Sequence, residues 1–170
     1  MLISEEYREQ QRKLHENPNY GVMSVQYAPL VSNVINKLHI TELLDYGAGK
    51  GRLAQNLKVD HKMRIQMYEP ANPDWAFPPS PSQMVTCIDV LEHIEPDNLD
   101  DVLDDLKRVT NEVGFFTIHT GPAMKVLDDG RNAHLIQQDA DWWLPKILAR
   151  WQLNTFQRTE NGFWVMVEPR

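Results

Sequence analysis

The sequence predicts an α/β fold in which a doubly wound, mostly parallel sheet carries helices on both faces. Three observations predict it. Residues 41–57 combine a short apolar run, three alternate glycines and apolar residues at helical spacing, which indicates a strand, a tight turn and a helix. Residues 84–90 form a near-continuous apolar run, typical of a strand buried on both faces. The turn at 159–162 separates two further strand-like segments and indicates an antiparallel hairpin.

The composition is that of one globular domain, residues 1–170, long enough for a full core. The formal net charge of −7 and the absence of a long basic run argue against binding to nucleic acid phosphates. Cys87 is the single cysteine, so no internal disulfide is expected. Without a signal peptide or an apolar segment of about 18 residues, we expect a cytoplasmic protein with no membrane contact.

Residues 1–40 are expected to form an N-terminal helical arm, and residues 41–170 the α/β core. Sparse apolar residues in 3–17 indicate a weakly amphipathic helix or a mobile arm. If this arm folds over a ligand as a lid, Tyr20 contacts that ligand; otherwise Tyr20 anchors a surface loop. Pro29 suits the first position of a second helix, which ends near Leu38.

The glycine turn indicates a site for a nucleotide-type cofactor, because alternate glycines let a ligand approach the backbone. A dinucleotide fingerprint requires a third small residue, and Arg52 occupies that position after Gly47 and Gly49. Asp45, just before the turn, would also repel a pyrophosphate. S-adenosylmethionine carries a sulfonium and an ammonium group and no phosphate. Residues 41–170 are therefore expected to be a cofactor-binding core for S-adenosylmethionine.

A second expected strand, 64–69, ends in Glu69, shortly beyond the glycine turn. A carboxylate at a strand end can accept hydrogen bonds from both ribose hydroxyls of an adenosine group. Pro70 and Ala71 are then candidates for the adenine face. Residues 72–82 are rich in proline and serine and too short for a helix and a strand, so the third strand–helix unit is expected to be shortened or missing.

The rest of the chain predicts alternating helices and strands. Residues 99–109 have apolar residues at helical spacing, and their aspartates indicate a solvated face. One helix does not supply a convergent set of ligands, so we expect no metal site. Expected after it are a strand at 114–120, a loop at 127–136, a helix at 141–148 and hairpin strands at 153–158 and 162–167.

Three motifs together resemble the class I S-adenosylmethionine-dependent methyltransferase family, in its small, single-domain, small-molecule branch. They are Leu-Leu-Asp-Tyr-Gly-Ala-Gly-Lys-Gly at 43–51, the strand end at Glu69, and Asp-Val-Leu-Glu-His-Ile at 89–94. The resemblance covers about residues 41–118. It implies a Rossmann-like, seven-stranded sheet with an antiparallel C-terminal hairpin. It also implies methyl transfer from S-adenosylmethionine to an oxygen or nitrogen of a small-molecule acceptor, by a monomer or homodimer.

The resemblance also assigns roles to residues. A general base is needed only if the acceptor must lose a proton, and histidine titrates in the useful range. His119, His134 and His93 are the candidate catalytic residues, with Asp89 and Glu92 nearby; each histidine is alternatively a loop residue bonded to backbone. The substrate candidates are Tyr20, His119, Arg131 and His134. The cofactor candidates are Asp45, Gly47, Ala48, Gly49, Gly51, Glu69, Pro70, Asp89, Val90 and Leu91.

Three other functions stay open on the sequence. The first is a non-catalytic S-adenosylmethionine-binding or regulatory module with the same fold. The second is a nucleic-acid methyltransferase, against which the acidic composition and the missing amino-methylation motif argue. The third is an NAD-linked enzyme, disfavoured by Asp45 and Arg52.

Overall fold

A computed structural model describes all 170 residues, and its centre is a six-stranded sheet with the order β2-β1-β3-β4-β6-β5. Strands β1 to β4 pair in parallel, whereas β6 runs antiparallel to both β4 and β5. The α/β prediction and the C-terminal hairpin are confirmed. The strands are β1 (Glu42–Tyr46), β2 (Arg64–Tyr68), β3 (Ser82–Ile88), β4 (Thr110–His119), β5 (Trp151–Arg158) and β6 (Gly162–Pro169).

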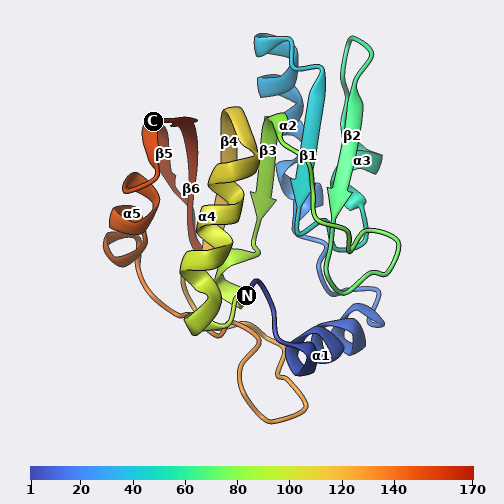
Figure 1. Ribbon diagram of the computed structural model, residues 1–170, viewed down its shortest axis with the longest axis vertical. Helices are drawn as coiled ribbons and strands as arrows, with labels where there is room; N and C mark the ends of the chain where they lie inside the picture. The colour runs from blue at the N-terminus through green and yellow to red at the C-terminus, as the bar shows by residue number, and fades with distance from the viewer.

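Helices cover both faces of the sheet (Figure 1). Leu43 and Phe115 pack with α2 and α3, while their chain neighbours Leu44 and Phe116 pack on the α4 and α5 side, as alternation along a strand requires. No helix is long and apolar enough to span a bilayer. The helices are α1 (Glu5–His15), α2 (Ser24–Leu38), α3 (Arg52–Asn56), η1 (Leu91–His93), η2 (Pro96–Asn98), α4 (Leu99–Val109) and α5 (Ala140–Leu148).

The start expected for the second helix is wrong. Helix α2 begins at Ser24, and Pro29 lies inside it. Pro29 has no amide hydrogen. The carbonyl of Val25, four residues earlier, therefore has no helical donor. Val25 is exposed, so water can satisfy that carbonyl, and burial of Ala28 and Val31 keeps the helix on the sheet.

The third strand–helix unit is missing, as the proline-rich segment indicated, so the sheet has six strands instead of seven. The chain passes from β2 to β3 through an irregular loop, and β2 is left at the edge of the sheet. The side-chain amide of Gln66 fastens this loop: its nitrogen donates to the Ser80 carbonyl at 3.1 Å and its oxygen accepts from the Ser80 amide at 3.0 Å.

The strand order places a crevice at the carboxyl ends of β1 and β3. From β1 the chain moves outward to β2, then returns to the other side of β1 as β3. In open α/β sheets, ligands bind where the strand order reverses in this way. Helix α1 and the segment between β4 and α5 lie at this same edge (Figure 1).

Candidate active site

A cavity of about 420 Å³ lies at this reversal of strand order. It is lined by residues that follow β1, β2, β3 and β4, by the loop before α5 and by α1 with the loop after it. Its size suits a ligand pocket. The expected site residues that line it are Tyr20, Asp45, Gly47, Ala48, Glu69, Pro70, Asp89, Val90, His93, His119 and His134.

The glycine turn is held against the end of β2 by backbone amides. The amides of Gly47 and Ala48 donate to the Tyr68 carbonyl at 2.8 and 2.9 Å, and the Gly49 amide donates to the Glu69 carboxylate at 3.1 Å. Gly47 has a φ of 81°, and a Cβ there would lie 2.4 Å from Cγ2 of Val90. Only glycine fits at this position, for both the backbone angle and the space.

Three acidic side chains line this half of the cavity with little positive charge near them. Asp45 accepts from the Thr86 hydroxyl at 3.0 Å, and burial raises its pKa to about 7. Burial also raises the pKa of Glu69, against the lowering effect of the Ala71 and Gly49 amides. Burial raises the pKa of Asp89, which stands in the left-handed region at φ 50° and accepts from the Thr117 hydroxyl at 2.6 Å. A cationic ligand would relieve this unbalanced negative charge.

Three histidines meet in the other half of the cavity. His119 ends β4, His93 ends η1 and His134 lies in the loop before α5. The ring of His134 is central, with its centroid 4.6 Å from that of His93 and 4.8 Å from that of His119. Burial lowers the pKa of His93 to about 3 and lowers the pKa of His134, so both rings are neutral near pH 7.

The hydrogen bonds of these histidines differ. Nδ1 of His93 lies 2.9 Å from the Ala133 carbonyl, and Nδ1 of His134 lies 2.7 Å from the Gly121 carbonyl. A carbonyl only accepts, so Nδ1 carries the proton in both rings and Nε2 carries a lone pair. His119 is the opposite case, because its Nδ1 accepts from the Gly121 amide at 3.2 Å, which puts the proton of the neutral ring on Nε2.

Glu92 lies beneath the histidines and is fully buried. One carboxylate oxygen, Oε1, accepts from the His119 amide at 3.1 Å. The other, Oε2, is buried and has no hydrogen-bond partner. Burial and the nearby Asp89 raise the pKa of Glu92 well above its usual value. A buried carboxylate oxygen without a partner is costly, so this atom requires an explanation.

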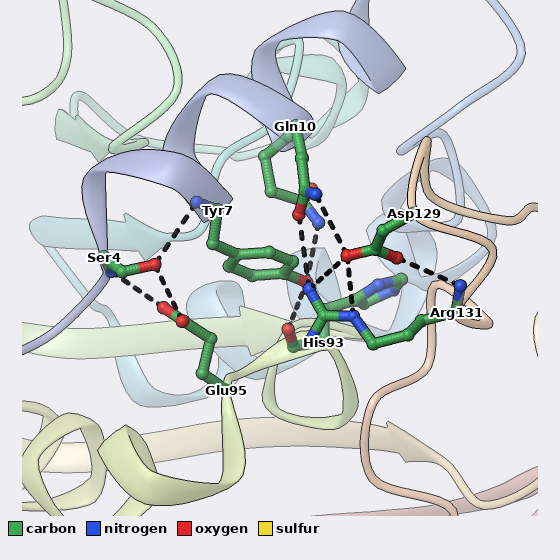
Figure 2. A network of polar contacts seen from close by, with 8 residues as sticks. Ser4, Tyr7, Gln10, His93, Glu95, Asp129 and Arg131 are labelled. Atoms are coloured by element: carbon green, nitrogen blue, oxygen red, sulfur yellow. Dashed lines mark hydrogen bonds and ion pairs between the residues drawn. The ribbon is translucent and has the colours of Figure 1, made fainter.

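Helix α1 is fastened over the cavity by polar contacts at several points (Figure 2). The Ser4 amide and hydroxyl donate to the Glu95 carboxylate at 2.7 and 2.8 Å, and the Tyr7 hydroxyl donates to the His93 carbonyl. Further along the helix, the Gln10 amide donates to Asp129 at 3.1 Å. The N-terminal arm therefore forms one wall of the site.

Four expected site residues do not line the cavity. Leu91 is fully buried in the core, and Arg131 pairs with Asp129 at 2.8 Å and points toward α1 (Figure 2). The structure therefore places neither side chain in the cavity, and their expected ligand contacts stay predictions. Gly49 does not line the cavity, but its amide donates a hydrogen bond to the Glu69 carboxylate. Gly51 caps α3, where a Cβ would meet the Trp75 ring at 3.0 Å.

Sequence reasoning missed the cavity residues of α1. Tyr7, Gln11 and His15 all line the cavity, and the Gln11 side-chain amide donates to the Tyr7 hydroxyl at 2.7 Å. The signal was the spacing of Tyr7 and Gln11, which places them on one face of a helix that has few apolar residues. Polar residues at that spacing usually mark a solvated face, so the pattern did not separate the two cases.

The chain is similar to a known protein family in sequence and to solved structures in fold. The sequence profile of a family described as "Methyltransferase domain" matches residues 9–162. No curated protein sequence matches the chain significantly. Among solved structures, the chain is similar to 1,6-didemethyltoxoflavin-N1-methyltransferase from Burkholderia thailandensis, crystallised with its substrate and S-adenosylhomocysteine. That likeness has a TM-score of 0.66 at 16% identity and covers 99% of this chain and 91% of the other.

Two further structures are similar at the same level. A complex of DhpI with S-adenosylhomocysteine has a TM-score of 0.66 at 15% identity, covering 98% of both chains. The mitomycin 7-O-methyltransferase MmcR has a TM-score of 0.64 at 14% identity, covering 95% of this chain and 60% of its own. At such identities the likenesses establish the fold.

Proposed function

The chain belongs to the methyltransferase-domain family, and from this premise we propose that it transfers the methyl group of S-adenosylmethionine to an oxygen or nitrogen of a small-molecule acceptor. The family match confirms the methyltransferase resemblance that the sequence motifs carry. Two of the similar structures hold S-adenosylhomocysteine, the demethylated form of the cofactor. One of these, and MmcR, are named for methylation of small molecules, which supports the same class of acceptor here.

One observation carries the proposal: a single cavity joins the acid-lined glycine turn to the histidine cluster. Methyl transfer requires the donor and the acceptor to be held in line in a site that excludes water. The cavity provides adjoining places for both. The side that follows β1 and β2 suits the donor, and the side of β3 and β4 suits the acceptor.

On the donor side, we assign the sulfonium and ammonium groups to the region of Asp45 and Asp89, where unbalanced negative charge favours a cation. We assign the ribose to Glu69. Each of its carboxylate oxygens accepts one backbone amide and has a second lone pair for a ribose hydroxyl. Pro70 is assigned to the adenosyl group, and Val90 to the neighbourhood of the methyl group.

On the acceptor side, the chemistry is an in-line displacement. A lone pair of the acceptor attacks the methyl carbon, the carbon–sulfur bond breaks, and its electrons stay on sulfur as a neutral thioether. A hydroxyl acceptor also loses a proton, for which His134 and His93, neutral and with a lone pair on Nε2, are candidate bases. His119 can act as the base only when its Nδ1 no longer accepts the Gly121 amide. Tyr20 borders the same region, its hydroxyl 3.3 Å from Nδ1 of His93.

We also propose that α1 and the loop after it, within the expected arm of residues 1–40, act as a lid, while α2 stays packed on the sheet. Helix α1 walls the cavity through contacts that are mostly exposed to solvent, such as Lys13 with Asp128 at 3.0 Å. Such contacts are weak singly and easily broken. Release of this helix would open the cavity for exchange of ligands. We also propose a cytoplasmic location and a monomeric or homodimeric state. Cys87, the single cysteine, is buried and forms no disulfide.

The test measures binding and transfer separately. Calorimetry should show that S-adenosylmethionine and S-adenosylhomocysteine bind the wild-type protein, and labelled methyl groups should pass to an extract of small metabolites. The His134→Ala variant should retain cofactor affinity and lose about 100-fold or more in turnover if this ring acts as a base. Absence of cofactor binding by the folded protein would refute the proposal.

A further inference from the structure

Three side chains with metal-ligating atoms converge beneath the acceptor side of the cavity. One donor atom each from Glu92, His93 and His134 lies within 4.8 Å of the others. The first two come from η1, and the third comes from the loop before α5. This convergence is absent from the sequence pattern, in which His134 is far from the other two.

The two histidines are in the state that a metal requires. The tautomers described above leave a lone pair on Nε2 of both His93 and His134. Oε2 of Glu92 is fully buried and lacks any partner in the protein. Burial of an unpaired carboxylate oxygen is explained if a cation binds it.

We propose that Glu92, His93 and His134 bind a divalent transition-metal ion. Two imidazoles and one carboxylate suit Zn²⁺ or Fe²⁺ and are a poor match for Mg²⁺ or Ca²⁺, which prefer oxygen ligands throughout. Three protein ligands leave at least one position open for a small molecule, as in catalytic metal sites. Donors around one tetrahedral ion at about 2.1 Å lie about 3.4 Å apart, so small side-chain rotations complete the site.

Each of the three ligands already has a supporting contact. The Ala133 and Gly121 carbonyls hold Nδ1 of His93 and His134, and the His119 amide holds Oε1 of Glu92. Backbone groups that fix the far side of ligating side chains are typical of metal sites. The proposal departs from the expectation of no metal site. That expectation was argued from the aspartates of α4, which are not among these three ligands.

His93 and His134 line the cavity, so an ion bound to them would have its open position on the cavity side. This step rests on the proposed function: a hydroxyl-bearing acceptor binds the ion through its oxygen. The ion lowers the pKa of that hydroxyl, whose proton passes to water. The oxygen then attacks the methyl carbon, and the carbon–sulfur electrons stay on sulfur, so the products are a methyl ether and S-adenosylhomocysteine. The acceptor class is thereby an alcohol or phenol.

The experiment uses protein stripped of metals with EDTA and titrated with Zn²⁺, and separately with Mg²⁺, in a calorimeter. The wild-type protein should bind one Zn²⁺ and show no comparable binding of Mg²⁺. Glu92→Gln and His134→Ala should each weaken Zn²⁺ binding by at least about 100-fold, since changes in supporting residues alone cost 10- to 100-fold. Zn²⁺ should also raise the melting temperature of the wild type and leave that of Glu92→Gln unchanged.

His39→Asn is the matched control, because His39 is exposed, stacks on His61 with centroids 4.1 Å apart, and has the left-handed backbone that asparagine tolerates. It should bind Zn²⁺ as the wild type does. Zn²⁺ binding that survives Glu92→Gln overturns the site. If that binding is lost in His39→Asn, the bound Zn²⁺ is an adventitious ion only. Equal binding of Mg²⁺ overturns the assigned metal class.

Cofactor titration of the same EDTA-treated protein separates the two proposals. S-adenosylmethionine binding without Zn²⁺ binding overturns the metal site and leaves the methyltransferase function in place. Zn²⁺ binding without S-adenosylmethionine binding supports the metal site and overturns the methyltransferase function. If both bind, a fall in transfer to alcohols on removal of Zn²⁺, with transfer to amines unchanged, supports the acceptor class, whereas equal falls or no change overturn it.

Discussion

The two sides of the cavity are built in different ways. Most of the donor side comes from one continuous piece of chain, from Asp45 to Pro70, which forms two neighbouring parallel strands and the turn between them, and Asp89 and Val90 join it from the end of β3. The acceptor side is assembled from η1, the end of β4, the loop before α5 and the arm at the start of the chain. Local sequence therefore determines the geometry of the first side, and long-range packing determines that of the second.

The two sides also differ in charge. The donor side holds buried acids whose pKa values are raised. The acceptor side and the arm hold histidines whose pKa values are lowered, above the buried acid Glu92. Burial disfavours the charged form in every case. The acids become more costly to bury as pH rises, and the histidines as pH falls. The predictions below test this contrast, beginning with the largest expected effect.

Gly47→Ala should abolish cofactor binding, with a loss of affinity of more than about 100-fold, equivalent to about 3 kcal/mol. Its Cβ would lie 2.4 Å from Val90, so the turn must move. Gly130→Ala is the matched control: it has a similar φ of 87° and nothing within 4 Å of its Cβ. Calorimetry should show near-normal affinity for Gly130→Ala, and equal losses in the two variants would contradict a local steric cause.

Asp45→Asn should stabilise the unliganded protein at pH 8 by about 4 kcal/mol. The pKa of Asp45 is raised from 3.8 to about 7, so the folded state retains a proton that the unfolded state has released between these values. Stability conferred by this group therefore falls as pH rises from about 4 to 7. Thermal melts should show a difference that grows over that interval, and a difference that stays constant from pH 4 to pH 7 would contradict the titration.

His15→Phe should act in the opposite pH range, with an effect of about 2 kcal/mol at pH 4. Burial lowers the pKa of His15 from 6.5 to about 4, so the unfolded state binds a proton there that the folded state does not. Wild-type stability therefore falls as pH drops from 6.5 to about 4, and phenylalanine removes this loss. Denaturant melts at pH 4 and pH 8 measure it, and an equal effect at both pH values would contradict the titration.

Ser4→Ala should loosen α1 by about 1 kcal/mol, because it removes an N-cap and a bond to Glu95 together. Hydrogen exchange should quicken in residues 5–15 and stay unchanged in the strands. Ser24→Ala is the control, since Ser24 begins α2 without a side-chain cap. Faster exchange across the whole chain would mean that α1 is part of the cooperative core and does not act as a lid.

The sequence supported a prediction of the fold and of the donor side because their signals are local. Alternate glycines after a strand, Asp45 before them and Glu69 at the next strand end lie within one strand–turn–helix–strand unit, so their spacing fixes their geometry. The short segment 72–82 also indicated that the third strand–helix unit would be shortened or missing, although the expected sheet had seven strands and the structure has six.

The family resemblance named the histidines of the acceptor side, but their arrangement was beyond prediction for a physical reason. The position of His134 depends on the path of an irregular segment after β4, which has no periodicity. That path brings His134 to His93, and it makes Glu92 a buried neighbour of both. The role of α1 depends on side-chain bonds such as that of Tyr7 to the His93 carbonyl, for which sequence spacing gives no signal.

The Gln66–Ser80 pair has a consequence for the edge of the sheet. An uncovered edge strand offers its backbone to other chains and promotes aggregation. At β2 the side-chain amide of Gln66 makes two hydrogen bonds to Ser80, with Pro79 and Pro81 flanking the contact, and proline donates no ladder hydrogen bond. Gln66 thus ties the loop that replaces the missing strand–helix unit to the strand that this omission leaves at the edge.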